Sequence, residues 1–186
     1  MSPETMDELP PLPIRTLLRA DYDHFLRLRL KPEGKALWYM WLNPKTLPVA
    51  LIRLVGAIEL SPLAPLGSVL RLLILWAFRV EIPRGCVIGP GFVLPHAGGI
   101  VLGSSRIGND VVVYQNVTLG ARAYDGVFER GTRPMIGNDV VIGAGAVVLG
   151  PVTIGNGATI AANSLVTRDV PAGATALGVP AEVKLN

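Results

Sequence analysis

Histidine and cysteine are the side chains best suited to chemistry near neutral pH, and this sequence contains two histidines, His24 and His96, and one cysteine, Cys86. A single cysteine forms no intrachain disulfide, and its small-residue position in a repeat predicts a buried, inert thiol. No cluster of cysteines or carboxylates lies at ligand spacing around the histidines, so we predict no metal site. The best candidate for acid–base chemistry is the imidazole of His96.

The elements that would position His96 are repeats of six residues. An aliphatic residue, usually followed by glycine, recurs every six residues from Ile82 to Val166, except for one step of seven after Ile100 and one insertion after Leu119. The fifth residue of each repeat is small or β-branched, and Gly, Asn and Asp supply the corners. We expect three short strands to close a triangular coil, and stacked coils to bury one aliphatic column. His96 breaks this template, because it stands where a neutral corner residue would serve.

The chain before the repeats has helical spacing instead. Its apolar residues predict four helical segments, at residues 14–30, 35–41, 47–58 and 67–80. A proline-rich turn at 61–65 separates the last two. The predicted organisation is a mobile lead-in at 1–13, a helical domain at 14–80, a β-helix at 81–181 with a loop at 122–135, and a tail at 182–186.

Composition excludes several classes of protein. The chain is 50% hydrophobic and 17% charged, which argues against disorder. Its net charge of +3 is scattered, so we expect no nucleic-acid partner. The N-terminus has no basic region followed by an apolar stretch, which predicts a cytoplasmic protein without a signal peptide. Charges and prolines interrupt the apolar stretch 47–78, so no spanning helix is expected, although peripheral membrane contact stays open.

Three motifs carry a resemblance to a known family: Pro95–Gly103 (PHAGGIVLG), Tyr114–Gly120 (YQNVTLG) and Leu177–Ala181 (LGVPA). They resemble the serine acetyltransferase branch of the hexapeptide-repeat transferases over about residues 81–181. The resemblance implies a mainly β fold, a left-handed parallel β-helix of hexapeptide repeats preceded by a small α-helical domain, assembled as a homotrimer. It also implies that His96 is the general base for transfer of acetyl from acetyl-CoA to a hydroxyl. The alternative is an exposed corner histidine.

An acidic residue orients the base in that family, fifteen positions before the histidine. The matching residue is Glu81, whereas the family usually has Asp. A carboxylate that binds the far ring nitrogen fixes the tautomer and stabilises the imidazolium as it forms. The alternative for Glu81 is a solvated charge that caps the first coil.

The acceptor site departs from the serine acetyltransferase pattern at two places. The branch carries an Arg-His pair before a proline of the loop, which helps hold the carboxylate of serine, and an Asp before the catalytic histidine, which can receive its amino group. This chain has Thr132 and Arg133 before Pro134, and it has Pro95 before the histidine. Arg130 or Arg133 could still bind an acceptor carboxylate, or both could be solvated loop residues.

The resemblance places coenzyme A in the groove between coils of neighbouring subunits. Matching positions with small side chains are Ala121, Ala144 and Ala162, and Arg168 and Lys184 are candidates for the phosphates. Small residues are also what the coil requires, so a purely structural role stays open.

The favoured prediction is therefore an acetyl-CoA-dependent O-acetyltransferase that acts on a saccharide hydroxyl in polysaccharide synthesis. Transferases of exopolysaccharide synthesis keep the histidine and favour Glu in the dyad, as this chain does. The alternatives are a serine O-acetyltransferase of cysteine biosynthesis and a catalytically inactive β-helix scaffold. The apolar helices would suit either a membrane-bound acceptor or packing between subunits.

Overall fold

The computed structural model describes residues 12–28, 37–123 and 126–185. Its N-terminal part is helical, as the spacing predicts, and consists of α1 (Ile14–Leu28), a 3-10 helix η2 (Leu37–Trp41), α2 (Leu47–Glu59) and α3 (Ala64–Phe78). Most of the predicted lead-in, and the predicted end of the first helix near residues 32–34, lie outside the described residues.

Helix α3 begins three residues before its predicted start. Pro65 occupies the first turn, where the missing amide hydrogen would have no partner within the helix in any case. The helix ends two residues before its predicted end because Arg79 adopts the left-handed conformation, with φ 53° and ψ 42°. The chain then enters the first strand.

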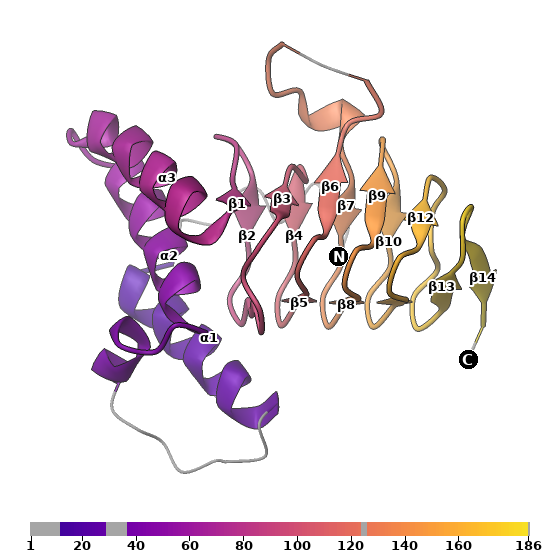
Figure 1. Cartoon of the computed structure of the whole chain (residues 1–186), viewed down its shortest axis with the longest axis horizontal. Helices are drawn as coiled ribbons and strands as arrows, with labels where there is room; N and C mark the ends of the chain where they lie inside the picture. The colour runs from indigo at the N-terminus through magenta and orange to yellow at the C-terminus, as the bar shows by residue number, and fades with distance from the viewer. Residues whose placement is uncertain (1–11, 29–36, 124–125, 186) are drawn as a thin grey trace.

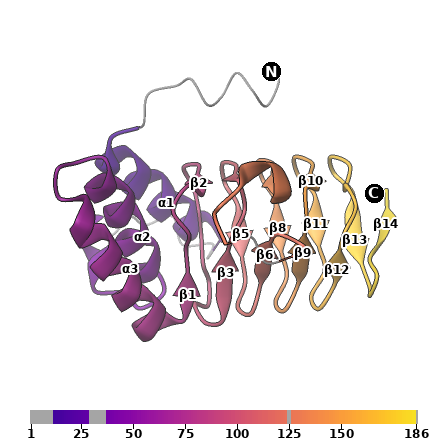
Figure 2. The same ribbon diagram turned by 90° about the horizontal axis from the view of Figure 1, so that it is seen from above.

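Short strands follow α3 in a continuous coil (Figures 1 and 2). They are β1 (Val80–Glu81), β2 (Val87–Ile88), β3 (Ile100–Leu102), β4 (Arg106–Ile107), β5 (Val112–Val113), β6 (Thr118–Gly120), β7 (Met135–Ile136), β8 (Val141–Ile142), β9 (Val147–Leu149), β10 (Thr153–Ile154), β11 (Thr159–Ile160), β12 (Leu165–Val166), β13 (Thr175–Leu177) and β14 (Glu182–Lys184). A second 3-10 helix, η3 (Arg130–Thr132), lies in the insertion between β6 and β7.

The strands stack into three sheets that form the sides of the coil. The first sheet has the order β1-β3-β6-β9-β12, the second β10-β7-β4-β2 and the third β14-β13-β11-β8-β5. Pairing is parallel except between β13 and β14. Val147 pairs with Leu165, eighteen residues further on, so three repeats close one coil. The predicted tail therefore includes a strand, because β14 turns back and caps the last coil.

The repeat pattern predicts the core correctly. From Leu94 to Val166 every aliphatic position of the repeat is buried. The small or β-branched positions are buried as well at Val111, Val117, Val140, Ala146, Val152, Ala158 and Ser164. The main hydrophobic cluster runs through the coils and joins Val49, Ile52 and Ile74 of the helices. One core thus connects the helical part to the first coil.

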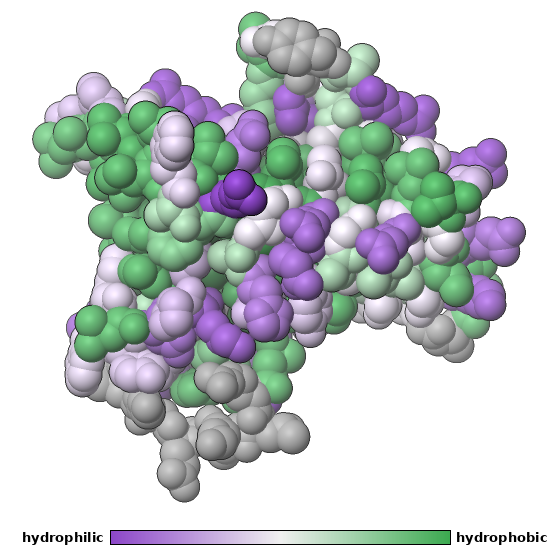
Figure 3. All heavy atoms as spheres, in the orientation of Figure 1, coloured by the Kyte–Doolittle hydropathy of each residue, from purple (hydrophilic) through white to green (hydrophobic). Residues whose placement is uncertain are grey.

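The outer face of α3 is apolar and exposed. Figure 3 shows hydrophobic residues gathered where Figure 1 places α2 and α3. The exposed side chains on this face include Leu66, Val69, Leu72, Leu73 and Trp76, of which Trp76 is 79% exposed. Among the described helices, none has both the length and the hydropathy to cross a membrane.

Candidate active site

His96 lies at the corner where the chain passes from the third sheet to the first. We call this edge the His96 corner, and it comprises residues 95–99, 114–117, 143–146 and 161–164. His96 is exposed and lines a hollow of 430 Å³ together with Arg79, Ala97, Gly98, Gly99, Gln115 and Asn116. A small molecule that enters this hollow reaches the imidazole from solvent.

Two features hold the segment that carries His96. Before it, Phe92 and Leu94 insert into the core of the first coil. After it, Gly98 and Gly99 turn the chain into β3 with φ values of 149° and 64°. A Cβ atom on Gly99 would lie 2.3 Å from the Asn116 side-chain oxygen, so a larger residue would be strained there and would have to displace Asn116.

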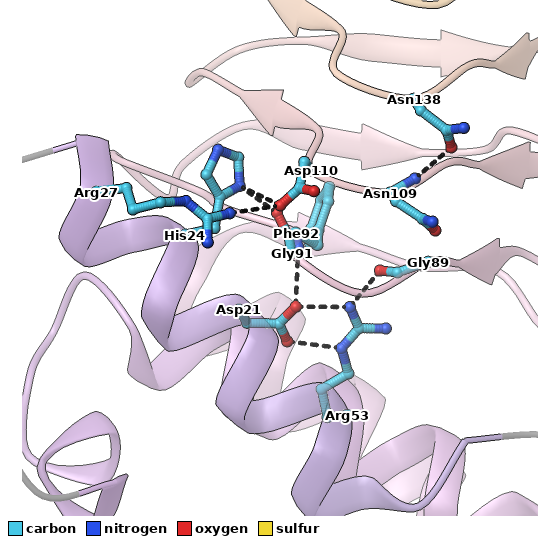
Figure 4. A network of polar contacts seen from close by, with 10 residues as sticks. All are labelled: Asp21, His24, Arg27, Arg53, Gly89, Gly91, Phe92, Asn109, Asp110 and Asn138. Atoms are coloured by element: carbon cyan, nitrogen blue, oxygen red, sulfur yellow. Dashed lines mark hydrogen bonds and ion pairs between the residues drawn. The ribbon is translucent and has the colours of Figure 1, made fainter.

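A buried polar network fixes the base of the same segment to the helices (Figure 4). Asp21 of α1 accepts a hydrogen bond from the Phe92 backbone N–H at 2.8 Å and two from the Arg53 guanidinium at 2.8 and 2.9 Å. Arg53 of α2 also donates to the carbonyls of Ile88 and Gly89. His24, the other histidine, is buried with Nδ1 2.5 Å from the Gly91 carbonyl, so its role is structural.

Glu81 lies on β1, one coil above His96, and is exposed. It pairs with Val101 of β3, five residues beyond the histidine. Between these two described residues the structure contains no hydrogen bond or ion pair. The structure therefore places both side chains on the outer surface of adjacent coils, and the dyad stays a prediction.

The arginines of the insertion lie at another corner. The chain enters the first sheet from the His96 corner and leaves it at what we call the loop corner, residues 82–86, 103–105, 121–123, 126–134, 150–152 and 167–169. Arg133 stacks on Phe128, with 4.2 Å from the guanidinium carbon to the ring centroid, and donates to the Gly103 carbonyl. Arg130 is exposed within η3. Within one chain neither arginine lines the hollow beside His96, and neither does Pro95.

The predicted coenzyme positions divide between the two corners. Ala144 and Ala162 lie on the His96 corner, one above the other, since the Asn163 N–H donates to the Ala144 carbonyl. This edge continues to the hollow, because the Gly145 N–H donates to the carbonyl of Gln115. By contrast, Ala121 and Arg168 lie at the loop corner and Lys184 on β14; all three are at least partly exposed.

Cys86 is a poor nucleophile. Burial raises the pKa of its thiol to about 12, although Arg133, Arg130 and Arg71 favour the thiolate. The thiol is therefore protonated at neutral pH. The described residues also contain no group of three or more His, Cys, Asp or Glu able to hold a metal.

Sequence reasoning missed Arg79 and gave no role to Gln115 or Asn116, although both of the latter belong to the motif Tyr114–Gly120. Only the fold brings Arg79 to the hollow, because it joins the end of α3 to the start of β1. Gln115 and Asn116 could have been found from the sequence, because they are two polar residues at the corner of the coil that follows the one with His96.

Comparison with known proteins places the chain among transferases. Residues 133–168 match the family described as bacterial transferase hexapeptide (six repeats). A serine acetyltransferase of Helicobacter pylori strain J99 is 43% identical over 104 residues, which are 55% of this chain and 59% of that protein. A second serine acetyltransferase, from Escherichia coli K12, is 46% identical over 57% of this chain and 38% of its own length. The chain thus spans less than two thirds of these curated relatives.

The fold of a solved serine acetyltransferase covers more of the chain. The structure of soybean serine acetyltransferase complexed with serine matches 92% of this chain and 69% of its own, with a TM-score of 0.78 and 34% identity. This confirms the predicted class, a left-handed parallel β-helix of hexapeptide repeats preceded by helices. By its repeats, its fold and this identity, the chain belongs to the hexapeptide-repeat transferases, in the branch that contains the serine acetyltransferases.

Proposed function

We propose that this chain transfers the acetyl group of acetyl-CoA to an acceptor hydroxyl, with His96 as the general base. The observation that carries the proposal is that His96 is the one exposed histidine of the sequence and lines a hollow, whereas His24 is buried and bound to backbone. A hydroxyl is a weak nucleophile at neutral pH, and imidazole is suited to take its proton.

The proposed reaction has two steps, and the proton that His96 removes in the first step is returned in the second. His96 removes the hydroxyl proton as the oxygen attacks the thioester carbonyl carbon. The carbon–sulfur bond then breaks, and the imidazolium returns the proton to the sulfur of coenzyme A. The products are an ester of the acceptor and the free thiol, without a covalent enzyme intermediate.

In this proposal Glu81 orients the imidazole. Glu81 and His96 are both exposed and lie on adjacent coils. Catalytic hydrogen bonds are often long in a free enzyme and shorten when the substrate binds. The prediction is that Glu81→Gln lowers kcat more than it raises the KM for either substrate.

We place the donor along the His96 corner. The support is the continuous edge of backbone and small side chains that runs from the hollow to Ala162. Small residues let backbone amides and carbonyls approach an extended pantetheine arm. Because Arg168 lies at the loop corner, the positive charge proposed for the phosphates comes from Lys184 and from Arg168 of a neighbouring copy in the proposed homotrimer. A solved relative is described as a serine acetyltransferase in complex with CoA.

L-Serine is the leading candidate acceptor. The reason is that the relatives compared above are serine acetyltransferases, and one of their structures holds serine. These relatives support serine over the saccharide that the sequence favoured. A saccharide hydroxyl remains the second candidate because of Pro95 and Thr132, which replace residues that would bind the charged groups of serine.

A homotrimer is part of the proposal, because one chain separates His96 from the arginine loop. The first sheet lies between the two corners, so the arginines of a neighbouring copy would complete the hollow. Subunit complementation tests this arrangement: a mixture of His96→Ala and Arg130→Ala chains, refolded together, should recover activity that neither variant has alone. The exposed apolar face of α3 would suit either packing between subunits or peripheral contact with a membrane-bound acceptor.

The deciding assay measures release of the coenzyme A thiol from acetyl-CoA with L-serine and with a panel of sugars. His96→Ala should lower kcat by about 10²- to 10⁴-fold, the usual contribution of a general base. Its melting temperature should not change, because His96 is exposed. If the wild-type protein turns over no hydroxyl acceptor, the transferase proposal fails and the scaffold alternative is favoured.

A further inference from the structure

The hollow beside His96 contains a cation contributed by the helix–strand junction. Arg79 lines this hollow with His96 and Gln115. Its guanidinium forms no hydrogen bond or ion pair with any other described residue. No acidic side chain is among the residues that line the hollow. An anion that enters would therefore meet a free guanidinium next to the general base.

Two backbone hydrogen bonds fix the main chain of Arg79 at the edge of the hollow. Its N–H donates to the Leu75 carbonyl, and its own carbonyl accepts from the Ile100 N–H at 3.0 Å. Its φ of 53° belongs to the left-handed region, where a side chain costs free energy and glycine does not. A strained arginine at a position suited to glycine points to a use for the guanidinium.

A second group in the hollow lacks a partner. The side-chain oxygen Oε1 of Gln115 is buried and accepts no hydrogen bond. A buried acceptor without a donor costs free energy, which a bound donor would recover. The hollow therefore offers a cation for a carboxylate, and a rotation of the Gln115 side chain would present its unpaired acceptor to an N–H or O–H group of a ligand.

We propose that Arg79 binds the carboxylate of the acceptor, and that Gln115 accepts a hydrogen bond from an amino or hydroxyl group of the same molecule. The acceptor class is then a hydroxylated carboxylic acid, either an amino acid such as serine or a uronic acid. This inference rests on the proposed function. It gives the acceptor a charge partner within the chain itself, in spite of Pro95 and Thr132.

The informative variant is Arg79→Gly, because glycine suits the left-handed backbone and the chain should fold at least as stably as wild type. Arg79→Lys keeps the charge but loses the planar fork. Arg19→Gln is the matched control, since it removes an arginine from the exposed surface of α1. All variants are compared with L-serine, its uncharged analogue L-serinamide, glucuronate and glucose as acceptors.

Loss of a charge-assisted hydrogen bond predicts that Arg79→Gly raises the KM for L-serine or glucuronate roughly 10- to 100-fold. The KM for the uncharged analogues and for acetyl-CoA should stay as in wild type, and Arg19→Gln should change none of them. An unchanged KM for the charged acceptors would overturn the proposal. A rise confined to acetyl-CoA would also overturn it, because Arg79 would then bind a phosphate of the donor.

Binding without turnover separates this inference from the proposed function. Dissociation constants for L-serine and glucuronate are measured by NMR titration of the full chain without acetyl-CoA. If no acceptor is turned over but carboxylate binding is lost in Arg79→Gly, the transferase proposal fails and the anion site stands. If wild type and Arg79→Gly bind both carboxylates equally, or neither binds them, the anion site is refuted.

Discussion

Breaking the ion pair between Asp21 and Arg53 should strongly destabilise the helical part. Asp21 is 1% exposed and Arg53 is 6% exposed. Replacing one partner of a buried ion pair leaves the other charge without compensation, which costs about 3–5 kcal/mol. Asp21→Asn keeps an acceptor for the Phe92 N–H, and Arg53 keeps two carbonyl partners. We therefore expect the lower end, about 3 kcal/mol.

The same helix offers a matched control. Arg19 and Asp23 form an ion pair with a separation of 2.9 Å, but their side chains are 62% and 39% exposed. Exposed pairs contribute at most about 1 kcal/mol, so Asp23→Asn should change stability very little. The two substitutions are chemically identical, but Asp21 is buried and accepts three hydrogen bonds, whereas Asp23 is partly exposed and accepts one.

Urea unfolding followed by circular dichroism measures the loss of unfolding free energy in both variants. The urea midpoints can be compared directly if the m value is unchanged. Replacing both partners, as in Asp21→Asn with Arg53→Met, should recover part of the loss, because the unpaired cation is removed. Equal losses from Asp21→Asn and Asp23→Asn would refute the reasoning, since burial would then make no difference to the pair.

Three further predictions follow from the coil itself. Gly99→Ala should lower stability by at least about 1 kcal/mol in thermal unfolding, because φ is 64° and the new Cβ meets Asn116; Gly120→Ala, with open space, is its control. The half-buried Cys86 thiol should react with a disulfide reagent at pH 8 more slowly in the native protein than in urea, because its raised pKa keeps it protonated; equal rates in the two states would contradict this. Stability should also fall between pH 9 and 12, because the unfolded thiol ionises near 9.0 and the folded one only near 12.

The β-helix could be predicted because its information is local and repeated. Each repeat places an aliphatic residue inward, and the pattern survives both the step of seven after Ile100 and the insertion after Leu119. The buried positions Ile107, Val148 and Ile160 follow from the period alone. Helix ends were harder, since the start of α3 depends on a proline that the first turn tolerates.

The polar network could not be predicted, because its partners are distant in sequence and half of them are backbone. Asp21 and Arg53 each look like solvated charges on a helix. Only packing of α1 and α2 against the first coil brings them to the amide of Phe92 and the carbonyls of Ile88 and Gly89. A periodic pattern of side chains does not reveal which backbone carbonyls, such as those of Ile88 and Gly89, will accept a hydrogen bond from a distant side chain.

The candidate site was predictable by residue type but not by placement. His96 breaks the repeat and therefore stands out, whereas its neighbour Arg79 is indistinguishable from any arginine at the end of a helix. The order of the three sheets around the coil also limits which residues can meet, and the sequence motifs do not show this limit. The first sheet must separate the His96 corner from the loop corner in every coil, so Arg130 cannot serve the histidine of its own chain without crossing that sheet. In the proposed homotrimer a second copy would remove the conflict, and Arg79 would give each copy a cation that does not depend on it.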